Sequence, residues 1–189
     1  MKKFLSTIRE MRKFLVLWFG QSFSALGSAM TAYALVIWSY SQEGSALMTA
    51  LLMVCSYTPY VVFSIFAGTL ADRWNKKALI ILPDALIAVA TVVLSLAIAN
   101  GMTALAMFFV ILAIRSAGAG VQSPAVQSFI PEITPEPKLL RVNSINGTIQ
   151  SVNMIAAPAI AAVLVNIMPL WAILYVDVTT AVIGIVSSR

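Results

Sequence analysis

The sequence predicts an all-α membrane protein with six transmembrane helices, and three observations lead to this fold class. Of the 189 residues, 60% are hydrophobic and only 10% are charged, whereas soluble domains carry about 25% charged residues. The mean hydropathy is +0.94. The apolar residues also gather into runs of roughly 20 residues, the length that crosses a ~30 Å hydrocarbon core. We therefore expect most of the protein surface to face lipid rather than water.

Six apolar spans follow one another along the chain, separated by short polar connections. A basic segment over residues 1–13 precedes the first span, which is too long for the apolar region of a cleaved signal peptide. In the fourth connection, Pro131, Pro135 and Pro137 interrupt the helical pattern. Residues 14–189 thus form a single predicted six-helix bundle. Its spans cover residues 14–40, 46–71, 78–100, 103–129, 140–166 and 170–187.

The positions of the basic residues predict the orientation of the bundle. Eleven of the twelve lysines and arginines lie in the N-terminal segment, the second and fourth connections and the C-terminal tail. The first, third and fifth connections have none, so the positive-inside rule places both ends of this segment in the cytoplasm. We expect a multi-pass protein of a bacterial plasma (inner) membrane, with the lipid bilayer around it. The net charge of +5 is explained by topology, and we predict no binding to nucleic acid.

Two aspartates in similar surroundings suggest an internal repeat. Asp84 opens the segment Asp84-Ala-Leu-Ile-Ala-Val89 in the third span, and Asp177 opens Asp177-Val-Thr-Thr-Ala-Val182 in the sixth. Both lie about two turns after the start of their span, on opposite sides of the membrane. An inverted repeat of three plus three helices produces this arrangement.

The second connection carries the most specific motif of the chain, Gly68-Thr-Leu-Ala-Asp72-Arg73-Trp-Asn75-Lys76-Lys77. It resembles the loop between helices two and three of the major facilitator superfamily, where the usual pattern is Gly-x-x-x-Asp-Arg-x-Gly-Arg-Arg/Lys. Asn75 replaces the second glycine, and we expect it to keep the left-handed turn because asparagine tolerates that conformation. The resemblance implies a conformational gating loop in which Asp72 holds a second half of the transporter. The alternative is a solvated loop whose charges only set the topology.

Three further segments carry the resemblance. Tyr57-Thr-Pro59-Tyr60, upstream of the loop, resembles the entry to this loop in drug and siderophore exporters of the superfamily. Arg115-Ser-Ala-Gly118-Ala-Gly120 is similar to the arginine motif of the fourth helix. The segment Ala157-Pro158-Ala-Ile-Ala161-Ala162 stands where exporters of the superfamily have Gly-Pro-x-x-Gly-Gly, and its proline can still kink helix five. The overall pattern is most similar to the macrolide-efflux and enterobactin-exporter branch. The resemblance implies half of a twelve-helix major facilitator fold, with a second six-helix half supplied by the same polypeptide or by another chain.

Polar residues recur at helical spacing in the first, fourth and fifth spans. Arg115 is the strongest of them, because a cation near the membrane centre costs on the order of 3 kcal/mol and should face a cavity or a partner. In the superfamily, helices one and four line the central cavity and helix five flanks it, so the resemblance implies a substrate site here. The alternative is that these residues only hold helices together. The predicted cavity residues are Gln21, Ser24, Ser28, Thr31, Arg115, Gln122, Gln150 and Asn153.

The acids inside the membrane limit how transport can be driven. The chain has no histidine, so a proton-coupling group in this half must be a carboxylate. Asp84 and Asp177 are the acids that fall within the predicted spans. Asp84 lies within reach of the basic second connection, which favours structural pairing, and a proton-carrying role is the alternative for both. The coupling residue can also belong to the other half.

The leading hypothesis is proton-coupled secondary active efflux of an amphipathic small molecule, such as a drug or siderophore, by alternating access. The alternative is a truncated or non-transporting six-helix half that serves only as a structural partner. An intramembrane enzyme is disfavoured, because serine and metal-dependent intramembrane proteases need a histidine. We predict no cofactor and no metal site. The expected partners are the small-molecule substrate, protons and the second half.

Overall fold

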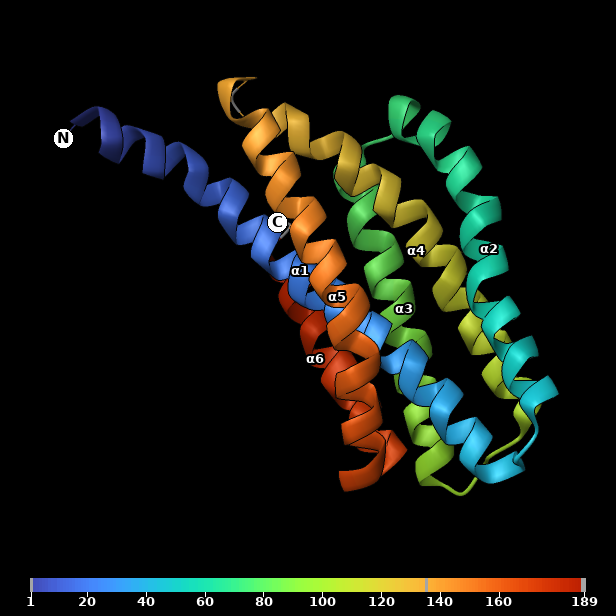
Figure 1. The fold of residues 1–189 in the computed structure, drawn as a ribbon. Helices are drawn as coiled ribbons and strands as arrows, with labels where there is room; N and C mark the ends of the chain where they lie inside the picture. Colours follow the sequence, from blue (N-terminus) through green and yellow to red (C-terminus); the bar gives the residue numbers. More distant parts are fainter. Residues whose placement is uncertain (1, 135, 188–189) are drawn as a thin grey trace.

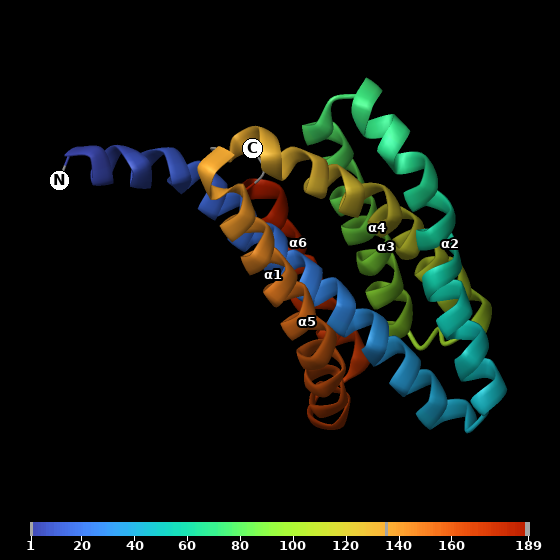
Figure 2. The same cartoon turned by 45° about the horizontal axis from the view of Figure 1, so that its top comes forward.

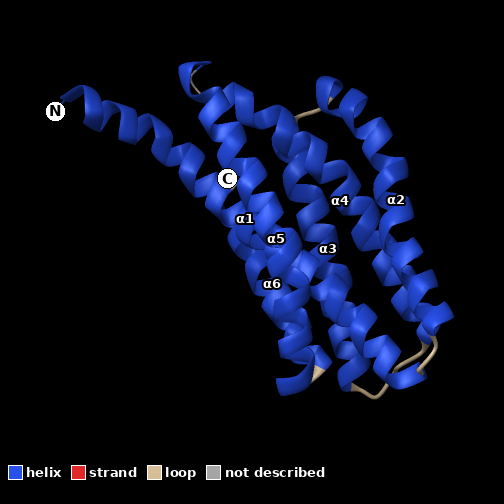
Figure 3. Ribbon diagram, in the orientation of Figure 1, coloured by secondary structure: helices blue, strands red, loops and turns tan. Residues whose placement is uncertain are grey.

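The computed structural model describes residues 2–134 and 136–187, and every regular element in these ranges is a helix (Figures 1 and 3). Side chains are described for residues 18–187 except 43, 70–73, 76–77, 133, 135 and 141. One short 3-10 helix, η1, lies in the fourth connection. The elements are α1 (Lys2–Glu43), α2 (Ala46–Arg73), α3 (Lys76–Ala99), α4 (Leu105–Ile133), η1 (Glu136–Lys138), α5 (Leu139–Ile167) and α6 (Leu170–Ser187).

Each of the six predicted spans corresponds to one long, apolar helix, so the predicted fold class is confirmed. The largest differences lie at two helix ends. α1 begins at Lys2, and its N-terminal part projects away from the bundle (Figure 2), while its apolar part covers Trp18–Gln42. α4 runs through Pro131 to Ile133 instead of ending at residue 129. Pro131 lies in the last turn, where losing one intrahelical hydrogen bond does not stop the helix.

The helices pack in the pattern of an inverted repeat. α1 packs against α5 and α6, and in the same way α4 packs against α2 and α3. α3 and α6 pack against each other between these two groups. Exchanging α1 with α4, α2 with α5 and α3 with α6 therefore reproduces the main contacts, as a repeat of three plus three helices requires.

The main apolar core closes one end of the bundle. It joins all six helices near the connections from α1 to α2, α3 to α4 and α5 to α6, with Leu35, Leu94 and Leu174 fully buried. Trp38 stacks on Phe108 there, with ring centroids 5.3 Å apart. The cores near the opposite end are smaller and involve fewer helices. This asymmetry leaves room for polar side chains in the middle of the bundle.

Candidate functional site

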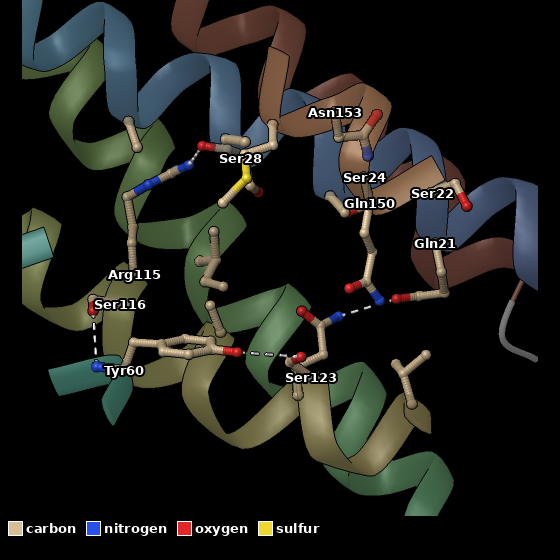
Figure 4. A pocket seen from close by; sticks show the side chains of 18 of the residues that line it. Gln21, Ser22, Ser24, Ser28, Tyr60, Arg115, Ser116, Ser123, Gln150 and Asn153 are labelled. Carbon is tan, nitrogen blue, oxygen red and sulfur yellow. Dashed lines mark hydrogen bonds between the residues drawn. The ribbon is translucent and has the colours of Figure 1, made fainter. Parts of the chain in front are cut away.

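A cavity of about 650 Å³ lies between α1, α2, α4 and α5 (Figure 4). Most of the surface area of its lining is apolar, and polar side chains reach it from all four helices. Drug-sized ligands bind in clefts of roughly 300–1,000 Å³ with this kind of lining. Its polar residues are Gln21, Ser22, Ser24, Ser28 and Tyr33 of α1, Ser56, Tyr57 and Tyr60 of α2, Arg115, Ser116, Gln122, Ser123 and Gln127 of α4, and Asn146, Gln150 and Asn153 of α5.

The structure places seven of the eight predicted cavity residues in this lining. They are Gln21, Ser24, Ser28, Arg115, Gln122, Gln150 and Asn153. In Figure 4, Gln150 and Asn153 project from α5 beside the polar face of α1. The lining is thus amphipathic, and substrate contact with these residues stays a prediction.

Thr31 was predicted to line the cavity, and the structure shows this to be wrong. Its side chain is fully buried, and its hydroxyl has no hydrogen-bond partner. It lies beside Met30 on α1, where the helix passes into the main apolar core. The cavity lining on α1 continues past this residue to Val36, so Thr31 lies on a buried face of the helix rather than beyond the end of the cavity.

Arg115 and Asp177 form an ion pair inside the bundle. Nη1 of Arg115 lies 2.6 Å from Oδ2 of Asp177. The Arg115 side chain is 6% exposed and the Asp177 side chain 1%. Ser28 Oγ donates to Asp177 Oδ1 at 3.0 Å, and Arg115 Nη2 donates to the Ser28 carbonyl at 3.3 Å. Arg115 also donates to the Thr91 hydroxyl. The sequence left the partner of Asp177 open, and the structure identifies it as the arginine of α4.

Asp84 lies in a second polar cluster. Gln21 Nε2 donates to Asp84 Oδ2 at 3.1 Å and to the Gly184 carbonyl at 3.3 Å, and Ser24 Oγ donates to Asp84 Oδ1 at 3.4 Å. Gln122 Nε2 of α4 in turn donates to Gln21 Oε1 at 3.2 Å. The sequence favoured pairing of Asp84 with the basic second connection, whose charged side chains lie outside the described residues. The described hydrogen bonds of Asp84 reach Gln21 and Ser24 of α1, and pairing with the second connection stays a prediction.

The two clusters occupy corresponding places in the inverted repeat. Each aspartate accepts from a long side chain of its own repeat: Asp84 of α3 from Gln21 of α1, and Asp177 of α6 from Arg115 of α4. Each of these two long side chains also donates a hydrogen bond to the other repeat, at the residue seven positions after that repeat's aspartate. That residue is Gly184 for Gln21 and Thr91 for Arg115. The chemical difference is that one aspartate has a cationic partner and the other has a neutral amide.

α2 is held against α4 at a proline inside the helix. The N–H of Tyr60, which directly follows Pro59, donates to Ser116 Oγ at 2.9 Å, and the Tyr60 hydroxyl donates to Ser123 Oγ at 3.4 Å (Figure 4). Gly120 lets the two backbones approach. A Cβ at Gly120 would lie 2.6 Å from the Tyr60 carbonyl oxygen. The α2 wall of the cavity is therefore fixed by α4.

The sequence of this chain matches the family model described as Major Facilitator Superfamily over residues 17–188. The chain belongs to this superfamily. The match covers all six membrane-length helices, so the family resemblance of the loop and helix motifs is confirmed.

The superfamily relatives include proteins named for efflux. The chain is 33% identical to Macrolide efflux protein A of Streptococcus pyogenes over 172 residues, which is 91% of this chain and 42% of that protein. It is 33% identical to Macrolide efflux protein A of Enterococcus faecalis over 141 residues, 75% of this chain and 43% of that protein. The uncharacterized MFS-type transporter YfiS of Bacillus subtilis is 25% identical over 170 residues. This major facilitator chain spans about two fifths of the length of these relatives.

The superfamily loop motif is described only in part. α2 ends at Arg73 and α3 begins at Lys76, while the side chains of Asp72, Arg73, Lys76 and Lys77 lie outside the described residues. Gly68 is exposed, with no atom within 4 Å of the position of a Cβ. The gating role of this loop stays a prediction.

Asn75 does not form the expected left-handed turn. No described residue other than glycine has a positive φ. The Asn75 carbonyl instead accepts from the Leu79 N–H at 3.1 Å, so Asn75 begins the first turn of α3. Asparagine is favoured at this N-cap position for its side-chain oxygen. Asparagine in place of the usual glycine therefore suits the start of a helix.

Two residues of the helix-five motif are packed inside this major facilitator chain. Ala157 and Ala161 are fully buried in the main core, whereas Ala162 is exposed and Pro158 lies inside α5. Because α5 packs chiefly against α1, the two buried alanines let these helices approach closely.

From the sequence, the aromatic and methionine side chains of α2 can form an apolar pocket, but lipid contact or core packing is favoured for most of them. In the structure, Met53, Tyr57 and Tyr60 line the cavity, and Ser116 and Ser123 join them from α4. α2 shows little contrast between its faces, because apolar side chains surround it on all sides. Its Ser56-Tyr57-Thr-Pro59-Tyr60 segment was the available signal.

Proposed function

We propose that this chain is the N-terminal half of a proton-coupled exporter of amphipathic small molecules. The cavity carries the proposal, since its size and its mixed polar and apolar lining suit such a molecule. The similarity to Macrolide efflux protein A points to drugs of that class, and hence to drug resistance. The distribution of basic residues supports a plasma (inner) membrane protein with cytoplasmic ends to this segment.

The proposed mechanism is alternating access between this half and a second six-helix half. α2 and α5 border the cavity and are the helices least covered by the rest of the bundle. Among their exposed side chains are Val61, Phe66, Met154 and Ile155. A second half packed on these helices would complete the cavity wall, and protons moving inward would drive the substrate outward.

The second candidate is a non-transporting half that acts as a structural partner. The relatives are more than twice as long as their matched segments, and one half supplies only part of a cavity wall. In this case the chain inserts and folds but exports nothing alone.

Efflux from cells separates the two candidates. A bacterial strain without macrolide exporters is given the complete open reading frame that contains this chain, or the 189-residue chain alone, and loaded with a radiolabelled macrolide. Export is expected from the complete reading frame and not from the chain alone. It is expected to be lost in the Arg115→Ala variant of the complete protein, while membrane insertion is retained. If the cells retain the macrolide with every version of the protein, the result contradicts the proposal.

A further inference from the structure

We propose that Asp84 is the proton-carrying group of this chain and that Ser24 connects it to the cavity. This inference rests on the proposed proton-coupled transport, for which it names a group and a route. It starts from the difference between the two repeat-related aspartates. Asp177 has Arg115 at 2.6 Å, whereas Asp84 accepts from an amide and a hydroxyl.

Burial makes the negative charge of Asp84 costly. The residue is 3% exposed, and among the side chains that the structure describes no lysine or arginine pairs with it. Neutral donors compensate only part of a carboxylate's lost hydration. Asp177 has a cation 2.6 Å away that balances its charge, and Asp84 has none among the described side chains, so the proton is expected at Asp84.

Among the described residues, the groups in direct contact with Asp84 carry no charge. Gln21 and Ser24 reach it from α1, Gln122 of α4 bonds to Gln21, and α6 contributes the backbone at Gly184. The other described charges buried in this interior are Arg115 and Asp177, which neutralise each other. An ionised Asp84 therefore leaves one uncompensated negative charge, and a protonated Asp84 leaves none.

The site suits a proton better than a metal cation. A bound cation needs several oxygen ligands directed at it. Here Gln21 Nε2 points its hydrogens at Asp84 Oδ2 and at the Gly184 carbonyl. These oxygens already accept N–H donors, and the amide would repel a cation between them. A proton needs only the carboxylate itself.

The route to Asp84 runs through the wall of α1. Gln21 and Ser24 line the cavity, and Asp84 lies behind them. α6 covers the other side so closely that a Cβ at Gly184 would lie 2.9 Å from Ser24 Cβ and 3.5 Å from Asp84 Oδ2. A hydroxyl is both donor and acceptor. Ser24 can therefore pass its proton to Asp84 Oδ1 while it accepts another from water in the cavity, and release reverses these transfers.

Protonation of Asp84 would also change the lining that a substrate meets. The ionised carboxylate accepts from Gln21 and Ser24. A protonated carboxyl group is itself a donor and needs an acceptor. At least one of the two side chains must then reorient, and both face the cavity. The proton and the substrate are thereby linked through the same residues.

Infrared spectroscopy of the reconstituted chain tests the protonation directly. The full chain is placed in phosphatidylcholine and phosphatidylglycerol vesicles and titrated from acidic to neutral pH. The C=O band of a protonated carboxyl group is expected near neutral pH, and Asp84→Asn should remove it. The control Glu136→Gln, at an exposed residue of η1, should retain it. A band that is absent from the unmodified chain, or unaffected by Asp84→Asn, would overturn the inference.

A second variant covers the case in which Asp84→Asn does not fold. Gln21→Leu removes a donor that stabilises the carboxylate, so the titration of the band should move to higher pH. An unchanged titration would count against Asp84 as its source. Ser24→Ala removes the proposed relay and should slow the response of the band to a pH jump, and an equal rate would overturn the route.

Transport measurements then distinguish this inference from the proposed function. The complete protein is reconstituted with a radiolabelled macrolide. The Asp84→Asn variant is expected to lose transport driven by a pH gradient and to keep exchange of labelled for unlabelled macrolide. Gradient-driven transport that survives in this variant overturns the role of Asp84. Absence of both activities from the unmodified protein overturns the proposed function instead, whatever the infrared result.

Discussion

Arg115 of α4 and Asp177 of α6 are joined by an ion pair of 2.6 Å in the interior of the helical bundle. The Ser28 hydroxyl and carbonyl of α1 bond to the two partners. One cluster thus ties together both repeats at the edge of the cavity. Each charge offsets part of the cost of burying the other, so the two residues should be considered as a unit.

Removing one charge of this pair should destabilise the bundle more than removing both. Asp177→Leu or Arg115→Met alone leaves a buried charge without its partner, which costs about 3–5 kcal/mol. The double variant Arg115→Met with Asp177→Leu should retain more stability than either single variant. The fraction of protein that stays monodisperse in detergent after heating measures this. Losses that simply add in the double variant would show that the residues are independent.

Replacing Gly120 should separate α2 from α4. The new Cβ of Gly120→Ala would lie 2.6 Å from the Tyr60 carbonyl oxygen and 3.0 Å from its Cα. Both are backbone atoms, so the helices must shift, at a cost of about 1–3 kcal/mol. Gly147→Ala is the matched control, since nothing lies within 4 Å of its Cβ position. Thermal melting in detergent should therefore show a loss for the first variant only, and equal melting of both would contradict this packing.

Ser116 should protect the backbone of α2 beside its proline. In Ser116→Ala the Tyr60 N–H loses its side-chain acceptor at 2.9 Å, and a lost hydrogen bond costs about 0.5–1.5 kcal/mol. Hydrogen exchange at Tyr60 should become faster. Ser144→Ala, at an exposed serine that donates to its own helix, should leave this exchange unchanged. Unaltered protection in Ser116→Ala would mean that the hydrogen bond is dispensable.

Cysteine labelling should distinguish cavity residues from core residues. The chain has one cysteine, Cys55, so Cys55→Ser provides a background without thiols. In it, Ser28→Cys and Asn153→Cys should react with a small, water-soluble thiol reagent, because both residues line the cavity. In contrast, Thr31→Cys should stay unreactive, because residue 31 is fully buried. Rapid labelling at position 31 would contradict the boundary between cavity and core.

The helices could be predicted because membrane spans are long and the physical constraint on them is simple. A run of about 20 apolar residues identifies each span. The short connections leave little freedom in how consecutive spans are arranged. The residue at which α1 begins could not be predicted in this way, because the hydropathy of residues 2–13 does not indicate whether they are helical. The end of α4 was misplaced because a proline in the last turn is compatible with the helix.

The site was predictable wherever a polar residue is costly in a membrane. Arg115 and Gln122 could be singled out from one sequence for this reason. Their partners could not, because Arg115 and Asp177 are 62 positions apart along the chain and meet only through the packing of the helices. Thr31 shares the spacing of Ser24 and Ser28, and only the packing of α1 separates it from them.

Substrate protection of the cavity tests the central claim most directly. In the complete protein, Asn153→Cys is labelled with and without a macrolide, and Gly101→Cys, in the exposed connection before α4, is the control. The macrolide should slow labelling at position 153 and leave position 101 unchanged. Unchanged labelling at position 153, in a protein that still exports the macrolide, would show that the substrate takes another route.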